Sequence, residues 1–236
     1  MTAHYLSRAQ LRRDPSVEAL ARVLLPDDHG ARAYSAHRLI WSLFTGDADV
    51  KRDFLYRADA PDLRRGARAQ LLILSRRAPN PDNSLLDVES KSFEPDLRDG
   101  DRLGFMLRAN ATRTRKTADG KSIRVDVVMD AIHKSGDRAE ARSKAISEAG
   151  QAWLESQGAK SGFRLVADEH GERPSVSIDG YEQWRFPGLG RDGKISTLDF
   201  QGVLEVTDPR LFLTKLFDGF GRAKAFGCGL MLIRRA

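Results

Sequence analysis

The stretch that decides the fold is the end of the chain, DPRLFLTKLFDGFGRAKAFGCGLMLIRR, residues 208–235. Asp208 is a natural N-cap, Pro209 suits the first helical position and Gly219 is a typical helix stop, so the stretch predicts a helix over residues 209–218. A glycine-rich turn follows, and the apolar run over residues 226–235 predicts the last strand. A helix that leads through a turn into a closing strand indicates an α+β unit.

The turn holds four glycines and two cations within eleven residues: Gly219, Gly221, Arg222, Lys224, Gly227 and Gly229. A dinucleotide fingerprint needs its glycines before a helix, because the helix N-terminus binds the phosphate. Here the helix comes first, and no Gly-Lys-Ser/Thr of a P-loop occurs, so a nucleotide-dependent enzyme is disfavoured. The turn could instead form a backbone nest for an anion beside its two cations. The alternative is structural, a helix cap followed by a strand that the last two glycines tighten.

The rest of the chain repeats this kind of unit. The first half reads as a strand, a helix, two strands, a short helix or irregular element at 85–93, and a strong strand at 100–110. The second half again reads as strand, helix, two strands, helix and strand. We therefore predict an α+β fold of two tandem ferredoxin-like (RRM-like) βαββαβ domains, at residues 1–112 and 113–236. This fold is widely used for RNA binding, although a fold alone does not set a function.

Composition narrows the class of protein. The formal net charge is +6 and the isoelectric point about 9.6, which suits a polyanionic partner such as nucleic acid. No run of 18 apolar residues and no apolar signal core occurs, so we expect neither a membrane partner nor secretion. The single cysteine, Cys228, excludes an internal disulfide and fits a reducing cytoplasm. None of the five histidines lies in a zinc-type pattern, so we expect no metal site, and no cofactor motif is found.

Tyr34 and His37 are the candidate catalytic pair. Their spacing of three residues places both on one face of a predicted helix. A tyrosine and a histidine together can position, accept and donate protons near neutral pH. RNA cleavage by an adjacent 2′-hydroxyl needs no metal, but it needs such proton transfer together with cations around the phosphorane. The alternative is a packed core stripe in which Tyr34, Trp41 and Phe44 are buried and His37 is merely tolerated.

Three stretches together resemble one family. They are YSAHRLIWSLFTGDADVKRDFLYR (34–57), LGFMLRANATRTRK (103–116) and FQGVLEVTDPRLFLTKLFDGFGRAKAFGCGLMLIRR (200–235). They resemble the Y-x-x-H-x-x-x-W-x-L-F segment followed by R-D-F-L, the L-R-A-N strand and loop, and the glycine-rich C-terminal motif of the CasE family. Members of this family are the CRISPR-RNA endoribonucleases of the type I-E Cascade complex.

The resemblance implies two ferredoxin-like domains and metal-independent cleavage of CRISPR precursor RNA at the base of the repeat hairpin. The products would be a 2′,3′-cyclic phosphate or 3′-phosphate and a 5′-hydroxyl, and the enzyme would stay on the mature RNA with other Cascade subunits. The catalytic Tyr and His of the family fall on Tyr34 and His37, and its glycine-rich loop falls on the turn described above, with Lys224 as the matched cation. Some relatives carry a further basic residue soon after the histidine, whereas Ser42 occupies that neighbourhood here and Arg38 is the nearby cation.

Further RNA contacts are expected from two basic segments. Relatives use a basic hairpin of the second domain to enter the RNA stem, which by position is WRFPGLGRDGK with Arg185, Arg191 and Lys194. The segment TRTRKTADGK is a second candidate for backbone contact, with Arg113, Arg115, Lys116 and Lys121, and its alternative is a solvated linker. A non-catalytic RNA-binding subunit of the same fold is the remaining alternative for the whole protein.

Overall fold

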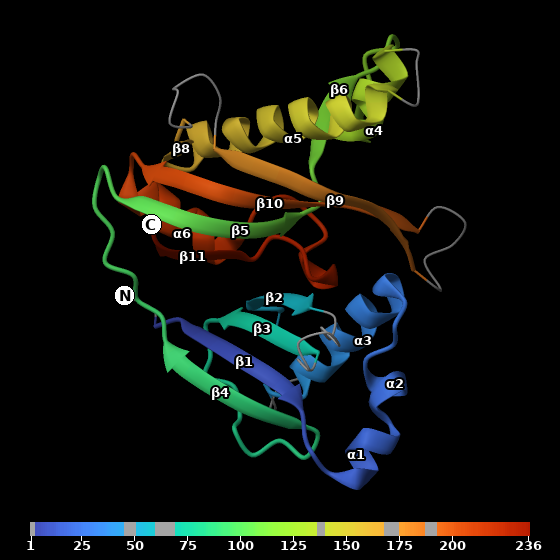
Figure 1. Cartoon of the computed structure of the whole chain (residues 1–236), viewed down its shortest axis with the longest axis vertical. Coiled ribbons are helices and arrows are strands. Elements are labelled where there is room, and N and C mark those ends of the chain that lie inside the picture. The colour runs from blue at the N-terminus through green and yellow to red at the C-terminus, as the bar shows by residue number, and fades with distance from the viewer. Residues whose placement is uncertain (1–2, 45–50, 60–68, 136–139, 168–174, 187–192) are drawn as a thin grey trace. The chain divides into compact units, whose positions relative to one another are not determined.

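The computed structural model describes residues 3–44, 51–59, 69–135, 140–167, 175–186 and 193–236 (Figure 1). The chain divides into two compact units. The first comprises Met1–Pro95, Trp184–Lys194 and Lys224–Gly227, and the second comprises Asp96–Gln183, Ile195–Ala223 and Cys228–Ala236. The first unit therefore contains two short segments that come from late in the sequence.

The first unit is built on a four-stranded antiparallel sheet. In spatial order its strands are β2 (Phe54–Asp59), β3 (Gln70–Ser75), β1 (Tyr5–Leu11) and β4 (Leu86–Ser92). The fourth strand lies beside the first, and the third lies between the first and the second, which is the ferredoxin-like order. The helices between β1 and β2 are α1 (Pro15–Ala19), α2 (Ala21–Leu24) and α3 (His29–Trp41).

Helix α3 packs its apolar side on this sheet. It begins where the Asp28 side chain accepts a hydrogen bond of 2.8 Å from the Ala31 N–H, which satisfies one of the free amides of the first turn. Ala36 and Ile40 are fully buried and share one core cluster with strand residues such as Ile73. Burial of this stripe fixes which side of α3 remains available to solvent.

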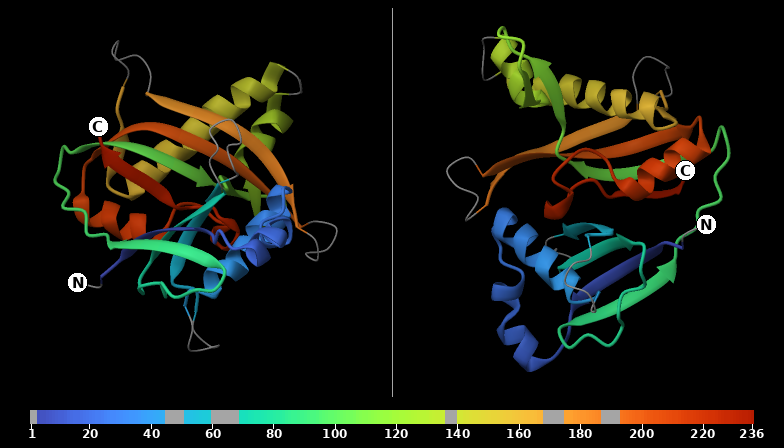
Figure 2. Two further views of the ribbon diagram at one scale, coloured as in Figure 1. Left: turned by 60° about the horizontal axis from the view of Figure 1, so that its bottom comes forward. Right: turned by 180° about the vertical axis from the view of Figure 1, so that it is seen from behind.

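The second unit contains another sheet of the same order. Its strands run β11 (Met231–Arg235), β5 (Arg102–Ala109), β10 (Lys194–Val206) and β8 (Phe163–Leu165), all antiparallel, and β9 (Val176–Arg185) pairs with β10. Helix α5 (Glu140–Lys160) runs along one face of this sheet (Figures 1 and 2), where the Trp153 and Phe200 rings stack with centroids 5.5 Å apart. These elements give the second unit its own aromatic core.

The closing helix forms as its sequence predicts. Helix α6 spans Pro209–Asp218, and Asp208 caps it by accepting hydrogen bonds of 3.0 Å from the N–H groups of Arg210 and Leu211. The helix ends at Gly219, whose φ of 83° is readily reached by glycine. The last strand, β11, begins at Met231 rather than at residue 226, because residues 224–226 form a short 3-10 helix, η2 (Lys224–Phe226).

The predicted fold class is confirmed, because both sheets have the strand order of a ferredoxin-like domain. The assignment of two strands differs. The strand at 100–110, expected to close the first half, is β5, and it pairs with β10 and β11 in the second sheet. Residues 86–92, expected to be a short helix or irregular element, form β4 and complete the first sheet. The units accordingly divide between Pro95 and Asp96 rather than at residue 112. Residues 76–85 contain no helix, so the first unit connects β3 to β4 by a loop.

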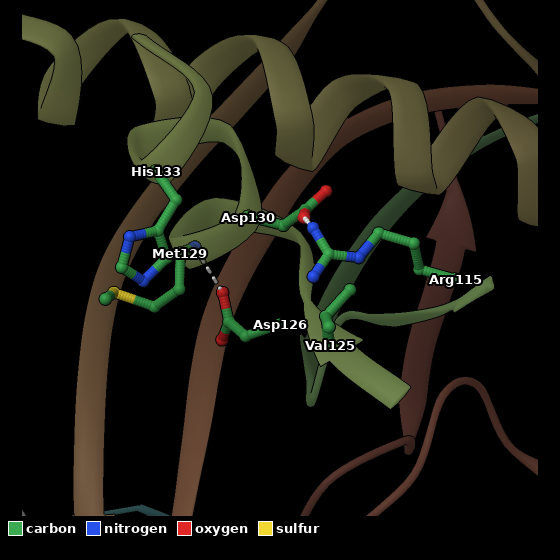
Figure 3. A pocket seen from close by; sticks show the side chains of 6 residues that line it. All are labelled: Arg115, Val125, Asp126, Met129, Asp130 and His133. Atoms are coloured by element: carbon green, nitrogen blue, oxygen red, sulfur yellow. Dashed lines mark hydrogen bonds and ion pairs between the residues drawn. The ribbon is translucent and has the colours of Figure 1, made fainter. Parts of the chain in front are cut away.

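The basic segment after β5 forms a hairpin held by a buried carboxylate. Strands β6 (Thr112–Lys116) and β7 (Ser122–Asp126) pair with each other and lead into α4 (Val127–Ser135). The Asp130 side chain on α4 is 2% exposed, and its two oxygens accept hydrogen bonds from Arg113 and from Arg115. Figure 3 shows the contact with Arg115, which measures 2.9 Å. This carboxylate therefore ties two of the hairpin's arginines to the helix.

In the first unit, the Tyr56 hydroxyl joins segments that lie far apart in the sequence. Tyr56 is fully buried on β2, and its O–H lies 2.7 Å from the Ala33 carbonyl on α3 and 2.9 Å from the Ala225 carbonyl on η2. A buried hydroxyl needs a partner, and here the two acceptors share it. The contact fixes η2 beside α3.

Replacement of Tyr56 by Phe removes this shared donor and leaves buried carbonyl oxygens without it. We expect Tyr56→Phe to lower the free energy of unfolding by about 1–2 kcal/mol, the cost of one missing buried hydrogen bond. Urea denaturation measures it. The matched control is Tyr34→Phe, because Tyr34 is 53% exposed and its substitution should change stability by less than about 0.5 kcal/mol. Equal stability of the two variants would contradict the structural role of the Tyr56 hydroxyl.

Replacement of Asp130 by Asn tests the anchor of the hairpin. The substitution removes the charge that faces Arg113 and Arg115, whose side chains are about half exposed. We expect Asp130→Asn to lower the free energy of unfolding by about 1–3 kcal/mol, less than for a fully buried pair because solvent screens the arginines. Asp119→Asn in the turn of the same hairpin is the control, since Asp119 pairs with the exposed Lys121 and its effect should be within experimental error. Thermal or urea unfolding of both variants distinguishes the two sites.

Candidate active site

Tyr34 and His37 lie on the side of α3 that its core contacts leave open. Tyr34 is 53% exposed, whereas His37 is half-buried. Because the buried stripe of α3 runs through Ala33, Ala36 and Ile40, Tyr34 does not belong to the core. The alternative of a packed stripe is therefore wrong for Tyr34, and it holds for Phe44, which is 6% exposed.

Aromatic rings surround the His37 imidazole. It stacks on Tyr56 with ring centroids 6.1 Å apart and planes at 18°, and the Phe54 ring lies 5.8 Å away at a tilt. The Trp41 indole meets it edge-on at 6.2 Å, and the indole N–H donates a hydrogen bond of 3.2 Å to His37 Nε2. The ring is thus held in one orientation by contacts with three neighbours.

Burial, and then the positive charge of Arg52, lowers the pKa of the His37 imidazole below its ordinary value of 6.5. Both causes disfavour the imidazolium and favour the neutral ring of His37. The Arg52 side chain is itself half-buried. Its Nη1 donates a hydrogen bond of 2.7 Å to the Phe54 carbonyl, and its guanidinium carbon lies 5.9 Å from the centre of the Phe54 ring. Arg52 is a fixed positive charge in this site.

The central part of the glycine-rich turn belongs to the first unit. Segment η2, which carries the half-buried Lys224, packs against α3 and is joined to it through Tyr56. Gly227 has a φ of 78°, and a Cβ there would lie 3.3 Å from the Tyr56 ring, so a side chain would crowd this contact. The structure therefore brings Lys224 and Gly227 to the helix that carries Tyr34 and His37.

The ends of the β9–β10 hairpin reach the same unit. The Trp184 ring meets the His29 ring edge-on at 5.6 Å, and the Phe186 ring lies 4.3 Å from the Phe226 ring of η2. A Cβ on Gly30 would lie 2.0 Å from the Arg185 carbonyl oxygen, so glycine allows the hairpin to approach the first turn of α3. Arg185 is exposed here, as is Lys194 at the start of β10, whereas Arg191 lies outside the described residues.

The remaining glycines of the turn have contacts within the second unit. The Gly219 N–H donates a hydrogen bond of 2.8 Å to the Lys215 carbonyl, where α6 ends. The Gly229 N–H donates a hydrogen bond of 2.7 Å to the Arg108 carbonyl on β5. A Cβ on Gly221 would lie 2.9 Å from the Asn110 carbonyl oxygen, and the exposed Arg222 forms a backbone bridge with Asn110. The amides of Gly219 and Gly229 thus stabilise the fold, as the structural alternative for this turn expected.

The other predicted basic residues differ in whether an ion pair within the protein holds them. Arg38 is exposed on α3 and Lys116 is exposed on β6, whereas Arg113 and Arg115 are both bound to Asp130. A pocket of about 340 Å³ lies beside Arg115 and Asp130. Among its lining residues (Figure 3), the Met129 N–H donates a hydrogen bond of 2.8 Å to the Asp126 carboxylate, and His133 lies on the side away from Arg115. An RNA phosphate at Arg113 or Arg115 must therefore compete with a carboxylate of the protein.

The sequence alone did not reveal that Trp41, Arg52 and Tyr56 surround His37 and set its orientation and charge. All three lie in the 34–57 stretch quoted for its family resemblance, which is the signal that could have found them. Their roles depend on contacts between α3, β2 and η2, and neither the four-residue spacing of Trp41 nor the charge of Arg52 reveals these contacts.

Metal-binding clusters and membrane-spanning helices are both absent from the part of the chain that the structure describes. No group of three or more His, Cys, Asp or Glu side chains is placed to hold a metal ion among those residues. Over the same ranges, no helix combines the length and apolar character needed to span a membrane.

Comparison with known proteins agrees with this architecture. The family described as "CRISPR associated protein" matches residues 4–235. The chain is 30% identical to the CRISPR system Cascade subunit CasE of Escherichia coli over 90% of its own length and 96% of that protein. It is also 30% identical to the CRISPR-associated endoribonuclease Cse3 of Thermus thermophilus, over 69% of its own length and 72% of that protein.

Among solved structures, Thermus thermophilus Cse3 bound to an RNA representing a pre-cleavage complex superposes with a TM-score of 0.70 at 26% identity, covering 98% of this chain and 99% of that one. The family match over residues 4–235 includes Tyr34, His37 and the glycine-rich turn. The chain belongs to the CasE family of CRISPR-associated proteins.

Proposed function

We propose that this chain is a metal-independent endoribonuclease that cleaves CRISPR precursor RNA at the base of the repeat hairpin and remains bound to the mature RNA within Cascade. The observation that carries the proposal is the helix α3, which presents an exposed Tyr34 and a half-buried, oriented His37 one turn apart and packs against the Lys224 segment. The relatives named as a Cascade subunit and as an endoribonuclease support it.

The proposed reaction is attack of a 2′-hydroxyl on the adjacent phosphate, which breaks the bond to the 5′-oxygen. It leaves a 2′,3′-cyclic phosphate (or the 3′-phosphate after hydrolysis) and a 5′-hydroxyl. Such a reaction needs a group for the 2′ proton, a donor for the 5′-oxygen and positive charge around the phosphorane. Tyr34 positions the 2′-hydroxyl or helps deprotonate it, His37 acts as general acid or base, and Lys224 holds the phosphate.

Further cations bind the RNA backbone in this proposal. The exposed Arg38, Lys116, Arg185, Lys194 and Arg222 are available to phosphates as they stand, and Arg191 is assigned by its place in the hairpin sequence. Arg113 and Arg115 exchange Asp130 for phosphate when RNA arrives. The turn glycines Gly219, Gly221, Gly227 and Gly229 contribute by letting the backbone follow the RNA closely. An A-form stem is recognised largely by shape, phosphates and 2′-hydroxyls, which suits such contacts.

We place this reaction in the cytoplasm. Cys228 is the single cysteine of the sequence and is buried, and a lone cysteine fits a reducing compartment. A protein that remains on its processed RNA meets the other Cascade subunits there.

Replacement of His37 by Ala tests the catalytic assignment. We expect His37→Ala to cut the host's repeat RNA about 10²–10⁴-fold more slowly in the presence of EDTA, the typical contribution of a general acid or base, while binding the RNA as tightly as before. Gel assays of cleavage and of binding measure the two quantities. His133→Ala is the matched control, because His133 is exposed on α4 in the second unit.

A repeat RNA with a 2′-deoxy sugar at the cleaved step separates the chemistry from binding. The wild-type protein should bind this RNA and leave it intact. Cutting of the deoxy RNA would contradict 2′-hydroxyl attack, and full-rate cutting by His37→Ala would leave the protein as an RNA-binding subunit with another catalytic group or none.

Replacement of Lys224 by Ala tests the phosphate contact. The plot of log affinity against log salt should become shallower by about 0.7–0.9, because the variant neutralises one phosphate fewer than the wild-type protein. Fluorescence anisotropy with the 2′-deoxy repeat at several salt concentrations measures the slope. Lys144→Ala is the control, because exposed Lys144 pairs with Glu148 along α5 and its replacement should leave the slope unchanged. An unchanged slope in Lys224→Ala would show that this residue does not bind an RNA phosphate.

A further inference from the structure

Trp41 and His37 form a hydrogen bond that determines where the histidine carries its proton. Trp41 follows His37 by four residues, so the two side chains lie on one face of α3. The indole Nε1 lies 3.2 Å from His37 Nε2. Indole nitrogen is a donor only, so Nε2 must be the acceptor, without a proton of its own. Neutral His37 consequently carries its proton on Nδ1.

Packing holds this hydrogen bond in place. The Trp41 ring meets the Phe54 ring edge-on with centroids 5.3 Å apart, and the His37 ring is stacked on Tyr56. Rotation of the imidazole to present Nε2 elsewhere would break the stack on Tyr56, whose hydroxyl is itself bound to two carbonyls. Among the described residues, His37 Nδ1 makes no hydrogen bond, so its N–H has no partner within that part of the chain.

We propose that Trp41 is the positioning residue of the site: its indole N–H selects the His37 tautomer whose Nδ1–H is offered to the RNA. The inference rests on the proposed function and narrows it. Neutral His37 in this tautomer donates a hydrogen bond through Nδ1 to a phosphate oxygen or to the leaving 5′-oxygen. It cannot remove the 2′ proton through that nitrogen, because the nitrogen is already protonated.

Protonation of His37 opposes the same hydrogen bond. A proton on Nε2 would turn that atom into a donor that faces the indole donor, so the contact favours the neutral ring. Arg52, just before β2, also lowers the pKa of His37 through its positive charge. The other cations on adjoining elements are Arg38 on α3 and Lys224 on η2. The nearest carboxylate in sequence to Arg52, Asp53, is bound by Arg77 at 2.7 Å, and the Tyr56 hydroxyl is bound to carbonyls.

The test compares wild-type protein with Trp41→Phe, which keeps an aromatic ring but removes the N–H. Nitrogen-15 NMR of the RNA-free wild type should show His37 as the Nδ1–H tautomer, with the signal assigned from its absence in His37→Ala. In Trp41→Phe the Nε2–H tautomer should appear and the pKa of His37 should rise, because the variant has no hydrogen bond that favours the neutral form. Trp153→Phe is the control, since Trp153 stacks on Phe200 in the second unit and its replacement should leave His37 unchanged.

The pH dependence of stability gives a second readout. The pKa of His37 lies below 6.5 in the folded protein, so the unfolded chain binds its proton first, and stability is lost as the pH falls from 6.5 through the folded-state pKa. This decrease should be smaller in Trp41→Phe, because its folded-state pKa lies nearer the unfolded value.

Cleavage connects the hydrogen bond to the reaction. At neutral pH we expect Trp41→Phe to cut repeat RNA about two- to tenfold more slowly, the effect of removing one neutral hydrogen bond, and its pH–rate profile should shift to higher pH. On a His37→Ala background the substitution should have no further effect on the rate.

Each result decides a separate question. An Nε2–H tautomer in the wild-type protein overturns the inference, and this measurement requires no substitution. An unchanged tautomer in Trp41→Phe, or additive effects of the two substitutions on cleavage, also overturns it. Wild-type protein that shows the Nδ1–H tautomer but leaves the repeat RNA uncut would instead overturn the proposed function.

Discussion

The hydroxyl of Tyr56 is the constraint on which the candidate site depends. A fully buried tyrosine on a strand of the first sheet must find a partner for its O–H, and here the partners are carbonyls of α3 and η2. One of them, Ala225, is 169 residues further along the chain. The buried hydrogen bond thus gives a short segment near the C-terminus a fixed place beside an N-terminal helix, and the ring that carries it supports His37 by stacking.

The two candidate catalytic side chains lie in different environments although they are one helical turn apart. Tyr34 is exposed, so it keeps contact with water and can meet a substrate without rearrangement. His37 is enclosed by Trp41, Phe54 and Tyr56 beside the charge of Arg52, so its pKa is lowered and its ring orientation is fixed. Environments that separate neighbouring titratable groups in this way are typical of sites where each group has its own proton-transfer role.

The sequence predicted local features well and long-range pairing less well. The N-cap Asp208, the first-turn Pro209 and the stop Gly219 determine α6 through contacts within a few residues, and all three act as expected. The strand β5 was also recognised, but its place was not, because β4 and β5 are both acceptable strands and only their hydrogen-bonded partners decide which sheet each completes. Tyr34 and His37 are candidates from their spacing and from the family resemblance. The hydrogen bond from Trp41, the charge of Arg52 and the clamp of Tyr56 depend on how α3, β2 and η2 pack, which spacing alone does not encode.

The glycines of the closing turn perform different tasks, and this explains why so many occur together. Gly219 ends α6 and Gly229 binds the backbone of β5, so these two shape the turn from either side within the second unit. Gly227 has its φ in the left-handed region and lies against the Tyr56 ring, where a side chain would displace η2 from α3. Lys224 lies between them in the sequence, on η2, which packs against α3. The twelve residues 219–230 end α6, bind the Tyr56 hydroxyl through η2 and lead into β11. Such a path leaves little room for side chains, so glycine is favoured by the backbone itself.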